Sequence, residues 1–599
     1  TKRAVSHPVR LDRLPEHVWR PVLAAEDARF FDHSGMDARS LARATLANAK
    51  AGTVVQGGST ITQQLVKLRD MSPKRSLGRK ASEAVRSLAL EAEYDKEEIL
   101  EAYLNAVYYG HVDGVHLYGL GTAARAFFSK PAAELDLAES ALLAAMIQGP
   151  NRLSPVRNPE TVLTRYRWVL SRLGELDWAS SATIDAASRR LPRLRLSRLA
   201  LPPAPHFVDL LQAEAEKRAS NHSENGRGAV VHSSLDPLLQ TAAEAVVARE
   251  LDRLRSAHRR LRGEKLSAAL VALDGRTGDI LAYVGGDPDE RSDAFDRVRR
   301  ARRQPGSTVK PLVLLEAFES CGRRQAIYPA RRVSDRPLTV ELPSGPWSPE
   351  NPDRRFRDTV SVRDATVASL NVPFVRVARW CGYEATARRM RRAGLDLPDE
   401  PVPAFVLGAL ETSPLDLARA YTTFSSLGRA WRPRAYQQIF LPAGRLLDAE
   451  SARSEKVTRE ATAFLIRDLL EDVLRRGPAA SDALVGESAF GKTGTSSESR
   501  DAWFVGGAGS VVAAVWVGID AGGNLGLSGA RAAAPIWKAF MEEAVPLRPA
   551  LSPERPPKVV EHWIQTETGL LVGRQRSDAE AELFRRGATP PRRRLWRRD

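Results

Sequence analysis

The sequence predicts a multidomain protein in which a mainly α-helical first part is followed by an α+β second part with an antiparallel sheet. Its 599 residues exceed what a single hydrophobic core can hold. Up to about residue 195, apolar residues recur at spacings of three and four, as in segments 96–110 and 138–149. From residue 266 onward, short apolar runs alternate with glycine-containing turns, which is typical of strands.

Composition places the boundaries between these parts. Residues 1–195 are predicted to form the helical domain. Residues 196–265 contain a Pro-rich stretch followed by Asn, Ser and Gly, and are predicted to be a linker region. Residues 266–548 are predicted to form the α+β domain, and residues 549–599 a short basic C-terminal tail.

Within the α+β domain, two strand pairs and one buried helix are expected. One pair of strands flanks a turn at Asp274–Gly278, and another lies around Gly506–Gly509. The apolar run 311–320 is predicted to be a buried helix that begins near Ser307, directly after Pro305 and Gly306.

The net charge of +16 and the pI near 10 indicate an anionic partner. No zinc spacing, aromatic RNA-binding motif or basic heptad region is present, so a membrane surface or a phosphorylated substrate is favoured over nucleic acid. The two cysteines, Cys321 and Cys381, could form one bridge at most. No apolar run reaches the roughly 18–20 residues of a spanning helix, so any membrane anchor is expected to lie upstream of this chain.

Ser307 and Lys310 form an S-x-x-K motif at the expected helix start. Residues three apart share one helix face, and the unpaired N–H groups of a helix N-terminus favour developing negative charge. Only 14 of the 89 basic residues are lysine, which makes Lys310 an unusual choice in this chain. A buried amine beside a second cation can lose its proton at neutral pH, whereas a guanidinium cannot. This pair is therefore predicted to be a nucleophile and its base.

Two further elements follow in order: Ser369-Leu370-Asn371, and Lys492-Thr493-Gly494-Thr495. The three elements together resemble the motif set of penicillin-binding proteins and class A β-lactamases. In this interpretation Ser369 relays the proton and Asn371 orients the substrate amide. Lys492, Thr493 and Thr495 receive a substrate carboxylate, Gly494 allows close approach, and the N–H groups of Ser307 and Thr495 form the oxyanion hole.

The first half carries paired carboxylates in an aromatic setting. Glu26 and Asp27 precede Phe30, Phe31 and His33, a setting that can raise a carboxyl pKa into the range suited to proton transfer. His33 is interpreted as a structural residue. Segments GGSTITQQLVK, RKASEA and KEEILEAYLN follow.

The order and spacing of these segments resemble the lysozyme-like glycosyltransferase domain of bifunctional class A penicillin-binding proteins. Segments 142–155, 230–240 and 347–353 also resemble that family, so the likeness extends from about residue 10 to residue 545. The implied fold is a mainly α lysozyme-like glycosyltransferase domain followed by an α+β penicillin-binding/β-lactamase-like transpeptidase domain with an antiparallel sheet.

The resemblance implies a role for each motif residue of the first half. Glu26 is the general base that activates the acceptor lipid II, and Glu83 is the second acid. Lys67, Arg79 and Lys80 hold the pyrophosphate. Ser59, Thr60, Gln63 and Gln64 belong to the donor-site loop.

The resemblance also admits a divalent cation, Mg²⁺ or Mn²⁺, at Glu83, and implies no cofactor for the transpeptidase. Expected partners are lipid II, nascent peptidoglycan, β-lactams, the membrane surface and other cell-wall synthesis proteins, with no nucleic acid. The implied location is the extracytoplasmic face of the bacterial cytoplasmic membrane, with an anchoring N-terminal helix absent from this chain.

Two alternatives use the same folds. A hydrolytic protein would join a muramidase-like half to a D,D-carboxypeptidase or a β-lactamase, and the motifs do not separate acyl transfer to an amine from transfer to water. The basic residues Lys67, Arg79 and Lys80 disfavour a muramidase, which has no pyrophosphate to hold. A penicillin-binding sensor without turnover is disfavoured because the reactive side chains are all present.

Overall fold

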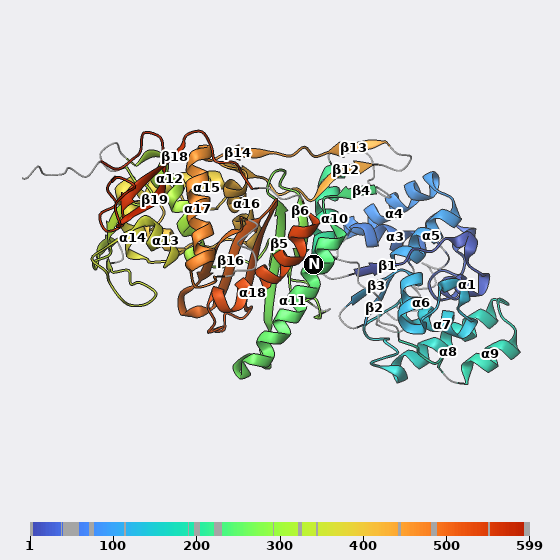
Figure 1. The fold of residues 1–599 in the computed structure, drawn as a ribbon. Coiled ribbons are helices and arrows are strands. Elements are labelled where there is room, and N and C mark those ends of the chain that lie inside the picture. The colour runs from blue at the N-terminus through green and yellow to red at the C-terminus, as the bar shows by residue number, and fades with distance from the viewer. Residues whose placement is uncertain are drawn as a thin grey trace, which may run out of the picture. The chain divides into compact units, whose positions relative to one another are not determined.

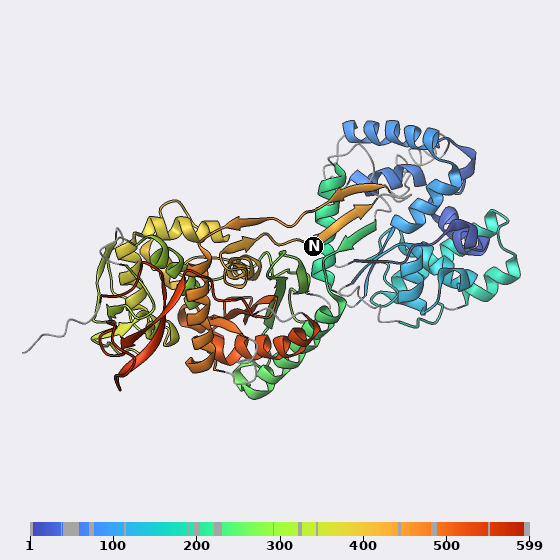
Figure 2. The same cartoon turned by 45° about the horizontal axis from the view of Figure 1, so that its top comes forward.

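In the computed structural model the chain divides into two compact units, Thr1–Pro203 (unit 1) and Ala204–Asp599 (unit 2). Each unit has its own hydrophobic core, and Figures 1 and 2 show the elements of both along the chain. The structure describes all residues except 1–3, 38, 40–58, 71–76, 113–114, 190, 197–203, 221–229, 291–292, 322–325, 343–344, 441–444, 481–487, 549–551 and 592–599.

Unit 1 is mainly helical, as predicted, and also contains a small sheet of order β1-β3-β2. Its helices are α1 (Glu16–Glu26), α3 (Ile61–Asp70), α4 (Leu77–Glu93), α5 (Lys96–Ala106), α6 (Leu120–Phe128), α7 (Leu137–Met146), α8 (Pro159–Glu175) and α9 (Ser181–Ser188). Its strands are β1 (Ala4–Ser6), β2 (Tyr108–Val112) and β3 (Val115–Tyr118).

Local sequence explains where α5 begins and ends. Asp95 and Glu98 form a capping box, in which each side chain accepts a hydrogen bond from the other residue's backbone N–H. The helix predicted for 96–110 is too long, because α5 ends at Ala106 and Tyr108 begins a strand. Val107 is β-branched and adopts an extended conformation, which stops the helix. The helix predicted for 138–149 corresponds to α7, which has the same kind of capping box but ends at Met146, so this prediction also runs too far.

Unit 2 combines helices on both sides of a central sheet. Its helices are α10 (Pro205–Ser220), α11 (Pro237–Ala257), α12 (Lys310–Ser320), α13 (Val362–Val367), α14 (Val372–Cys381), α15 (Tyr383–Ala393), α16 (Pro414–Ser425), α17 (Glu460–Arg476) and α18 (Gly529–Ala544). Its strands are β4 (Val230–Ser233), β5 (Leu266–Asp274), β6 (Ile280–Val284), β7 (Arg332–Ser334), β8 (Val340–Leu342), β9 (Gly345–Trp347), β10 (Thr359–Ser361), β11 (Arg429–Trp431), β12 (Tyr436–Phe440), β13 (Leu446–Ala449), β14 (Ser454–Lys456), β15 (Phe490–Thr495), β16 (Asp501–Ala508), β17 (Val511–Ile519), β18 (Val559–Gln565) and β19 (Ala579–Arg585).

The central sheet has the order β15-β16-β17-β5-β6, and all neighbouring strands are antiparallel, as predicted. Every residue of β5 is buried, and successive residues face opposite sides. Ala268 and Leu270 join a core with α11 and α18, whereas Ala269 and Val271 join a second core with α12 and α16. Helices on both faces explain why this strand reads as a continuous apolar run.

The strand pair expected around Gly506–Gly509 is confirmed, but its turn is shorter than predicted. β16 continues through Gly506 and Gly507 to Ala508. A Cβ atom at Gly506 would lie 2.2 Å from the carbonyl oxygen of Phe490 on β15. The glycine is therefore required by a neighbouring strand rather than by a turn.

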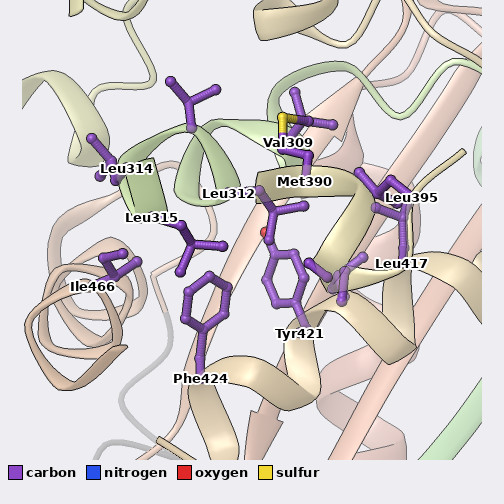
Figure 3. Close-up of a cluster of buried hydrophobic side chains, with 14 of the residues drawn as sticks. Val309, Leu312, Leu314, Leu315, Met390, Leu395, Leu417, Tyr421, Phe424 and Ile466 are labelled. Atoms are coloured by element: carbon purple, nitrogen blue, oxygen red, sulfur yellow. The ribbon is translucent and has the colours of Figure 1, made fainter. Parts of the chain in front are cut away.

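Helix α12 is the buried helix predicted for segment 311–320. Figure 3 shows Leu312 and Leu315 of α12 together with Tyr421 and Phe424 of α16 and Ile466 of α17. Because this helix is enclosed by its neighbours, the residues at its first turn have fixed positions.

Two segments are more structured than the sequence indicates. From Ala204 the expected linker belongs to unit 2, where α11 buries an apolar face against the sheet and β4 pairs with β12. The expected tail contains the hairpin β18–β19, which buries Phe584 against Tyr328. Both segments are rich in proline, glycine and charged residues, so their short apolar patterns are hard to recognise in the sequence. The helix and strands that these patterns form are stabilised by contacts with distant parts of unit 2. The basic segment 592–598 lies outside the described residues.

Cys321 and Cys381 form the one bridge that the sequence allows. Their disulfide joins the residue after α12 to the last residue of α14. Across the described part of the chain, none of the helices combines the length and the apolar content needed to cross a bilayer.

Candidate active sites

Ser307 lies in a single turn of 3₁₀ helix, Gly306–Val309, that leads directly into α12. The helix start is therefore close to its predicted position, although the first turn is tighter than an α-helix. With three residues per turn, Ser307 and Lys310 project from the same side. Gly306 has a φ of 54°, and a Cβ atom there would lie 2.3 Å from the carbonyl oxygen of Thr495. Glycine thus lets the Ser307 turn lie against the end of β15.

Both predicted lysines are completely buried and converge on Ser369. Lys310 Nζ donates to the Ser369 carbonyl oxygen at 2.6 Å and to Asn371 Oδ1 at 2.7 Å, and lies 3.5 Å from Ser369 Oγ. Lys492 Nζ donates to Ser369 Oγ at 2.9 Å. Ser369 has a φ of 56°, an uncommon conformation for a residue with a side chain. The structure thus brings together the three motifs that the sequence predicts to cooperate.

The electrostatics of this cluster favour a neutral amine. Burial, followed by the charge of Lys492, lowers the pKa of Lys310 well below its ordinary value. Burial lowers the pKa of Lys492 to about 7. Two ammonium groups that contact the same serine repel each other, so one of them loses its proton more readily. Lys310 can therefore act as a base near neutral pH.

A cavity of about 550 Å³ opens over this cluster. Ser307, Ser369, Asn371, Thr493 and Thr495 all line it. The cavity therefore offers a hydroxyl nucleophile, polar hydroxyls and a carboxamide to a substrate, with the two lysines buried beneath.

Gly494 also lines the cavity and has a structural reason to be glycine. A Cβ atom at this position would lie 2.2 Å from the carbonyl oxygen of Pro305. The backbone that leads to Ser307 therefore occupies the space that a side chain at 494 would need.

In unit 1, Glu26 is the last residue of α1 and accepts a hydrogen bond from Gln64 Nε2 of α3 at 2.9 Å. Tyr103 of α5 donates from its hydroxyl to Gln64 Oε1 at 3.0 Å, which fixes the orientation of the amide. Burial raises the pKa of Glu26, while the hydrogen bond from Gln64 and the charge of Arg165 on α8 lower it. The net upward shift gives Glu26 a proton affinity suited to a general base.

Asp27 has a structural role, unlike its neighbour Glu26. Its Oδ2 accepts from the Ile61 N–H at the start of α3 at 3.0 Å, and the same carboxylate contacts His33 Nε2 at 3.1 Å. Asp27 therefore holds α3 against α1, and His33 supports it, in agreement with the structural interpretation of that histidine.

The donor-site loop is only partly described. Thr60 Oγ1 donates to the Gly35 carbonyl oxygen at 2.7 Å and accepts from Gln63 N–H at 3.2 Å, so its hydroxyl helps to order the start of α3. Ser59 directly precedes it, whereas residues 51–58 lie outside the described residues.

The predicted pyrophosphate ligands remain predictions. Lys67 is exposed on α3 and Glu83 is buried on α4. Arg79 and Lys80 lie on α4, but their side chains are outside the described residues. Among the described residues of the chain, no group of three His, Cys, Asp or Glu side chains is arranged to hold a metal ion.

Tyr103, Arg165 and Asn351 are functional candidates that sequence reasoning did not single out. Tyr103 lies in the segment KEEILEAYLN and Asn351 in WSPENPD, both of which carry the family resemblance. Arg165 has no comparable local signal, because only the packing of α8 brings it to Glu26.

Comparison with known proteins agrees with the two-part architecture of the chain. A family described as "Transglycosylase" matches residues 1–174, and one described as "Penicillin binding protein transpeptidase domain" matches residues 268–542. The chain is 32% identical to penicillin-binding protein 1B of Haemophilus influenzae, covering 91% of this chain and 70% of that protein. It is also 32% identical to penicillin-binding protein 1B of Escherichia coli, covering 89% and 63%.

A relative from Aquifex aeolicus, penicillin-binding protein 1A, is 29% identical over 97% of this chain and 89% of its own length. The crystal structure of penicillin-binding protein 1A from H. influenzae has the same fold, with a TM-score of 0.64 and 21% identity over 98% of this chain and 96% of that one. Both halves and their order match the fold described above. The chain therefore belongs to the bifunctional class A penicillin-binding proteins, which carry peptidoglycan glycosyltransferase and transpeptidase activities and serve cell-wall synthesis.

Proposed function

We propose that Ser307 is the nucleophile of the transpeptidase and Lys310 its base. This proposal rests mainly on the hydrogen bonds around Ser369. Lys310 and Lys492 both donate to Ser369, and Asn371 accepts from Lys310, beneath a cavity that Ser307 lines. Ser307 Oγ attacks the carbonyl carbon of the stem peptide's terminal amide and passes its proton to Lys310. The D-alanine amine leaves with a proton, and an ester joins Ser307 to the peptide.

The acyl group then passes to the amine of a second stem peptide, which frees Ser307 and makes the cross-link. Ser369 lies between the two amines and can relay the proton. The N–H groups of Ser307 and Thr495 belong to segments that lie in contact through Gly306, which supports an oxyanion hole made from both. Thr493 and Thr495 receive the substrate carboxylate.

For unit 1 we propose that Glu26 takes the proton from the acceptor sugar hydroxyl of lipid II. That oxygen attacks the anomeric carbon of the growing strand with inversion, and undecaprenyl pyrophosphate leaves. The raised pKa of Glu26 and its fixed contact with Gln64 support this assignment.

Lys67, Arg79 and Lys80 are proposed to hold the leaving pyrophosphate, and Glu83 to contact a divalent cation when one is bound. Because both partners of this chemistry are lipid-linked, we propose that the protein works at the outer face of the cytoplasmic membrane. β-Lactams, nascent peptidoglycan and other cell-wall synthesis proteins are its proposed partners.

A single experiment tests both assignments. The parent protein, Ser307→Ala and Glu26→Gln are incubated with lipid II, and polymer, cross-linked peptide and released D-alanine are resolved. Ser307→Ala should make polymer without cross-links and should not be labelled by a fluorescent penicillin. Labelling that persists in this variant would show that another residue is the nucleophile. Release of D-alanine without cross-linking by the parent would favour the hydrolytic alternative.

A further inference from the structure

Asn371 stands at the N-cap of α14 but does not cap it. An asparagine at this position ordinarily accepts a hydrogen bond from an N–H group of the first turn. Here its Oδ1 accepts from Lys310 Nζ at 2.7 Å, its Nδ2 donates to the Glu350 carbonyl oxygen, and its side chain makes no capping bond. The first amides of α14 therefore need an acceptor from elsewhere.

Asn351 supplies that acceptor from a distant loop. Its Oδ1 accepts from the Asn371 N–H at 2.8 Å and from the Val372 N–H at 3.3 Å. The next residue, Pro373, has no N–H group, and these two bonds satisfy the two N–H groups that come before it. Asn351 is 2% exposed, so water does not compete for these contacts.

The orientation of the Asn351 amide is itself fixed. Its Nδ2 donates to Asp335 Oδ1 at 2.8 Å, to Asp335 Oδ2 at 3.0 Å and to the Arg355 carbonyl oxygen at 2.8 Å. A flipped amide would place oxygen against those acceptors and nitrogen against two N–H groups. Asp335 is completely buried and is held in turn by the Arg357 N–H at 2.9 Å.

We propose that Asn351 is a positioning residue of the transpeptidase, which caps α14 so that the side chain of Asn371 stays available to Lys310. Asp335 orients Asn351, Asn351 fixes the N-terminus of α14, and Asn371 then fixes the amine of the base. Asn351 is not among the residues that line the cavity, and it acts through Asn371. The proposal rests on the assignment of Lys310 as the base.

Without Asn351, the Asn371 carboxamide has two competing uses. It can turn back to cap its own helix, as free asparagine N-caps do, or it can stay on Lys310 and leave two buried amides unpaired. In the first case Lys310 loses a hydrogen-bond acceptor. In the second case the start of α14, which carries Asn371, is held less firmly. In both cases the position of the Lys310 amine is less well fixed. Acylation by a fluorescent penicillin should therefore slow by about tenfold or more in Asn351→Ala, as expected for a buried partner left unpaired.

A double-mutant cycle separates positioning from general destabilisation. Second-order acylation rate constants are measured for the parent, Asn351→Ala, Asn371→Ala and the double variant. If Asn351 acts through Asn371, the double variant should be no slower than Asn371→Ala alone within about twofold. Losses that multiply would show that Asn351 acts independently and would overturn the proposal. Asn351→Ala acylating at the parent rate would overturn it as well.

Controls keep the test decisive. Asn524→Ala alters an exposed asparagine of the same unit and should acylate at the parent rate. Lipid II polymerisation should be unchanged in every variant, because that site lies in unit 1. Thermal unfolding identifies any variant that fails to fold.

If the alanine variants fail to fold, Asp335→Asn tests the same proposal. This change keeps the shape of the side chain but points an N–H₂ group at Asn351 Nδ2 or at the Arg357 N–H. It should slow acylation by about three- to tenfold, and a parent rate would overturn the proposal. If Ser307→Ala is still labelled by penicillin, the proposed nucleophile fails, and that result is distinct from any of these.

Discussion

Lys310 and Lys492 set the protonation state of the transpeptidase site. Burial disfavours an ammonium group by several kcal/mol, which is why both pKa values fall. A base must be neutral before it can accept a proton. Its activity is therefore present above the lowered pKa and is lost as the pH falls through it.

Replacing Lys310 by arginine should nearly abolish acylation although the charge is kept. A guanidinium cannot lose its proton at any accessible pH, so the acylation rate constant should fall by roughly 10²- to 10⁴-fold. Stopped-flow acylation by a fluorescent penicillin measures this from pH 5 to pH 9. The parent rate should fall toward low pH, as the pH passes through the lowered pKa of Lys310. A parent rate that is independent of pH would contradict the assignment.

Glu26→Gln should slow lipid II polymerisation by roughly 10²- to 10⁴-fold, because the amide keeps the shape but cannot accept the proton. The same change should raise the melting temperature of unit 1. The pKa of Glu26 is raised by burial, so its charged form destabilises the folded state above that pKa, and a neutral amide removes this penalty. Product chromatography and thermal unfolding provide the two measurements. Polymerisation at the parent rate would eliminate Glu26 as the base.

Helices α12 and α14 carry their catalytic groups at one end and a disulfide at the other. Lys310 is the first residue of α12 and Asn371 directly precedes the first residue of α14, whereas Cys321 and Cys381 lie at the far ends. The disulfide fixes one end of the helix pair, and the Lys310–Asn371 contact fixes the other. Because α12 is buried among neighbouring elements of the core, it is also held in position along its length.

Removing the disulfide by Cys321→Ser with Cys381→Ser should lower the stability of unit 2 by about 2–4 kcal/mol, since the bridge closes a long loop. The sequence separation of 60 residues places it toward the larger end of that range. Acylation should change by less than about threefold, because Asn351 and Lys310 still hold the catalytic ends. Chemical unfolding with and without dithiothreitol compares the two proteins. A reductant effect that persists in the double serine variant would exclude the bridge as its cause.

The C-terminal hairpin is joined to the middle of unit 2 by a partly buried ionic cluster. Arg363 of α13 donates to Glu582 of β19 and to Asp468 and Asp472 of α17. α13 leads directly to Ser369, so the last described strand of the chain supports the segment that precedes this serine.

Arg363→Ala should destabilise this assembly by about 3–5 kcal/mol, because Glu582 and Asp468 lose this cation while lying close to Asp472, which keeps Arg475 and Arg476. The hairpin should then become accessible to protease between β18 and β19 while unit 1 keeps its melting transition. Limited proteolysis with mass spectrometry detects the cut. Arg336→Ala, which breaks an exposed pair with Asp358, serves as the matched control and should have little effect. Equal protection of the hairpin in both variants would contradict the role of the cluster.

The order and type of the two domains, the motif residues and the need for lysine at 310 and 492 could be predicted from the sequence. These features depend on local periodicity, on short spacings and on the chemistry of single side chains, all of which are present in the chain itself. The same reasoning shows that the bridge between Cys321 and Cys381 is possible, but it does not establish that the bridge forms.

Only the tertiary structure decided which distant groups meet. Asn351 lies 20 positions before Asn371, and Arg165 lies well over one hundred positions after Glu26, so neither contact leaves a periodic signal. The hairpin β18–β19 and α11 depend likewise on partners elsewhere in unit 2. Burial, which lowers the pKa of both lysines and raises that of Glu26, arises from packing by many elements at once. A local sequence pattern can identify a reactive residue. Its protonation state and the residues that hold it in position are determined only by the packing of the folded domain.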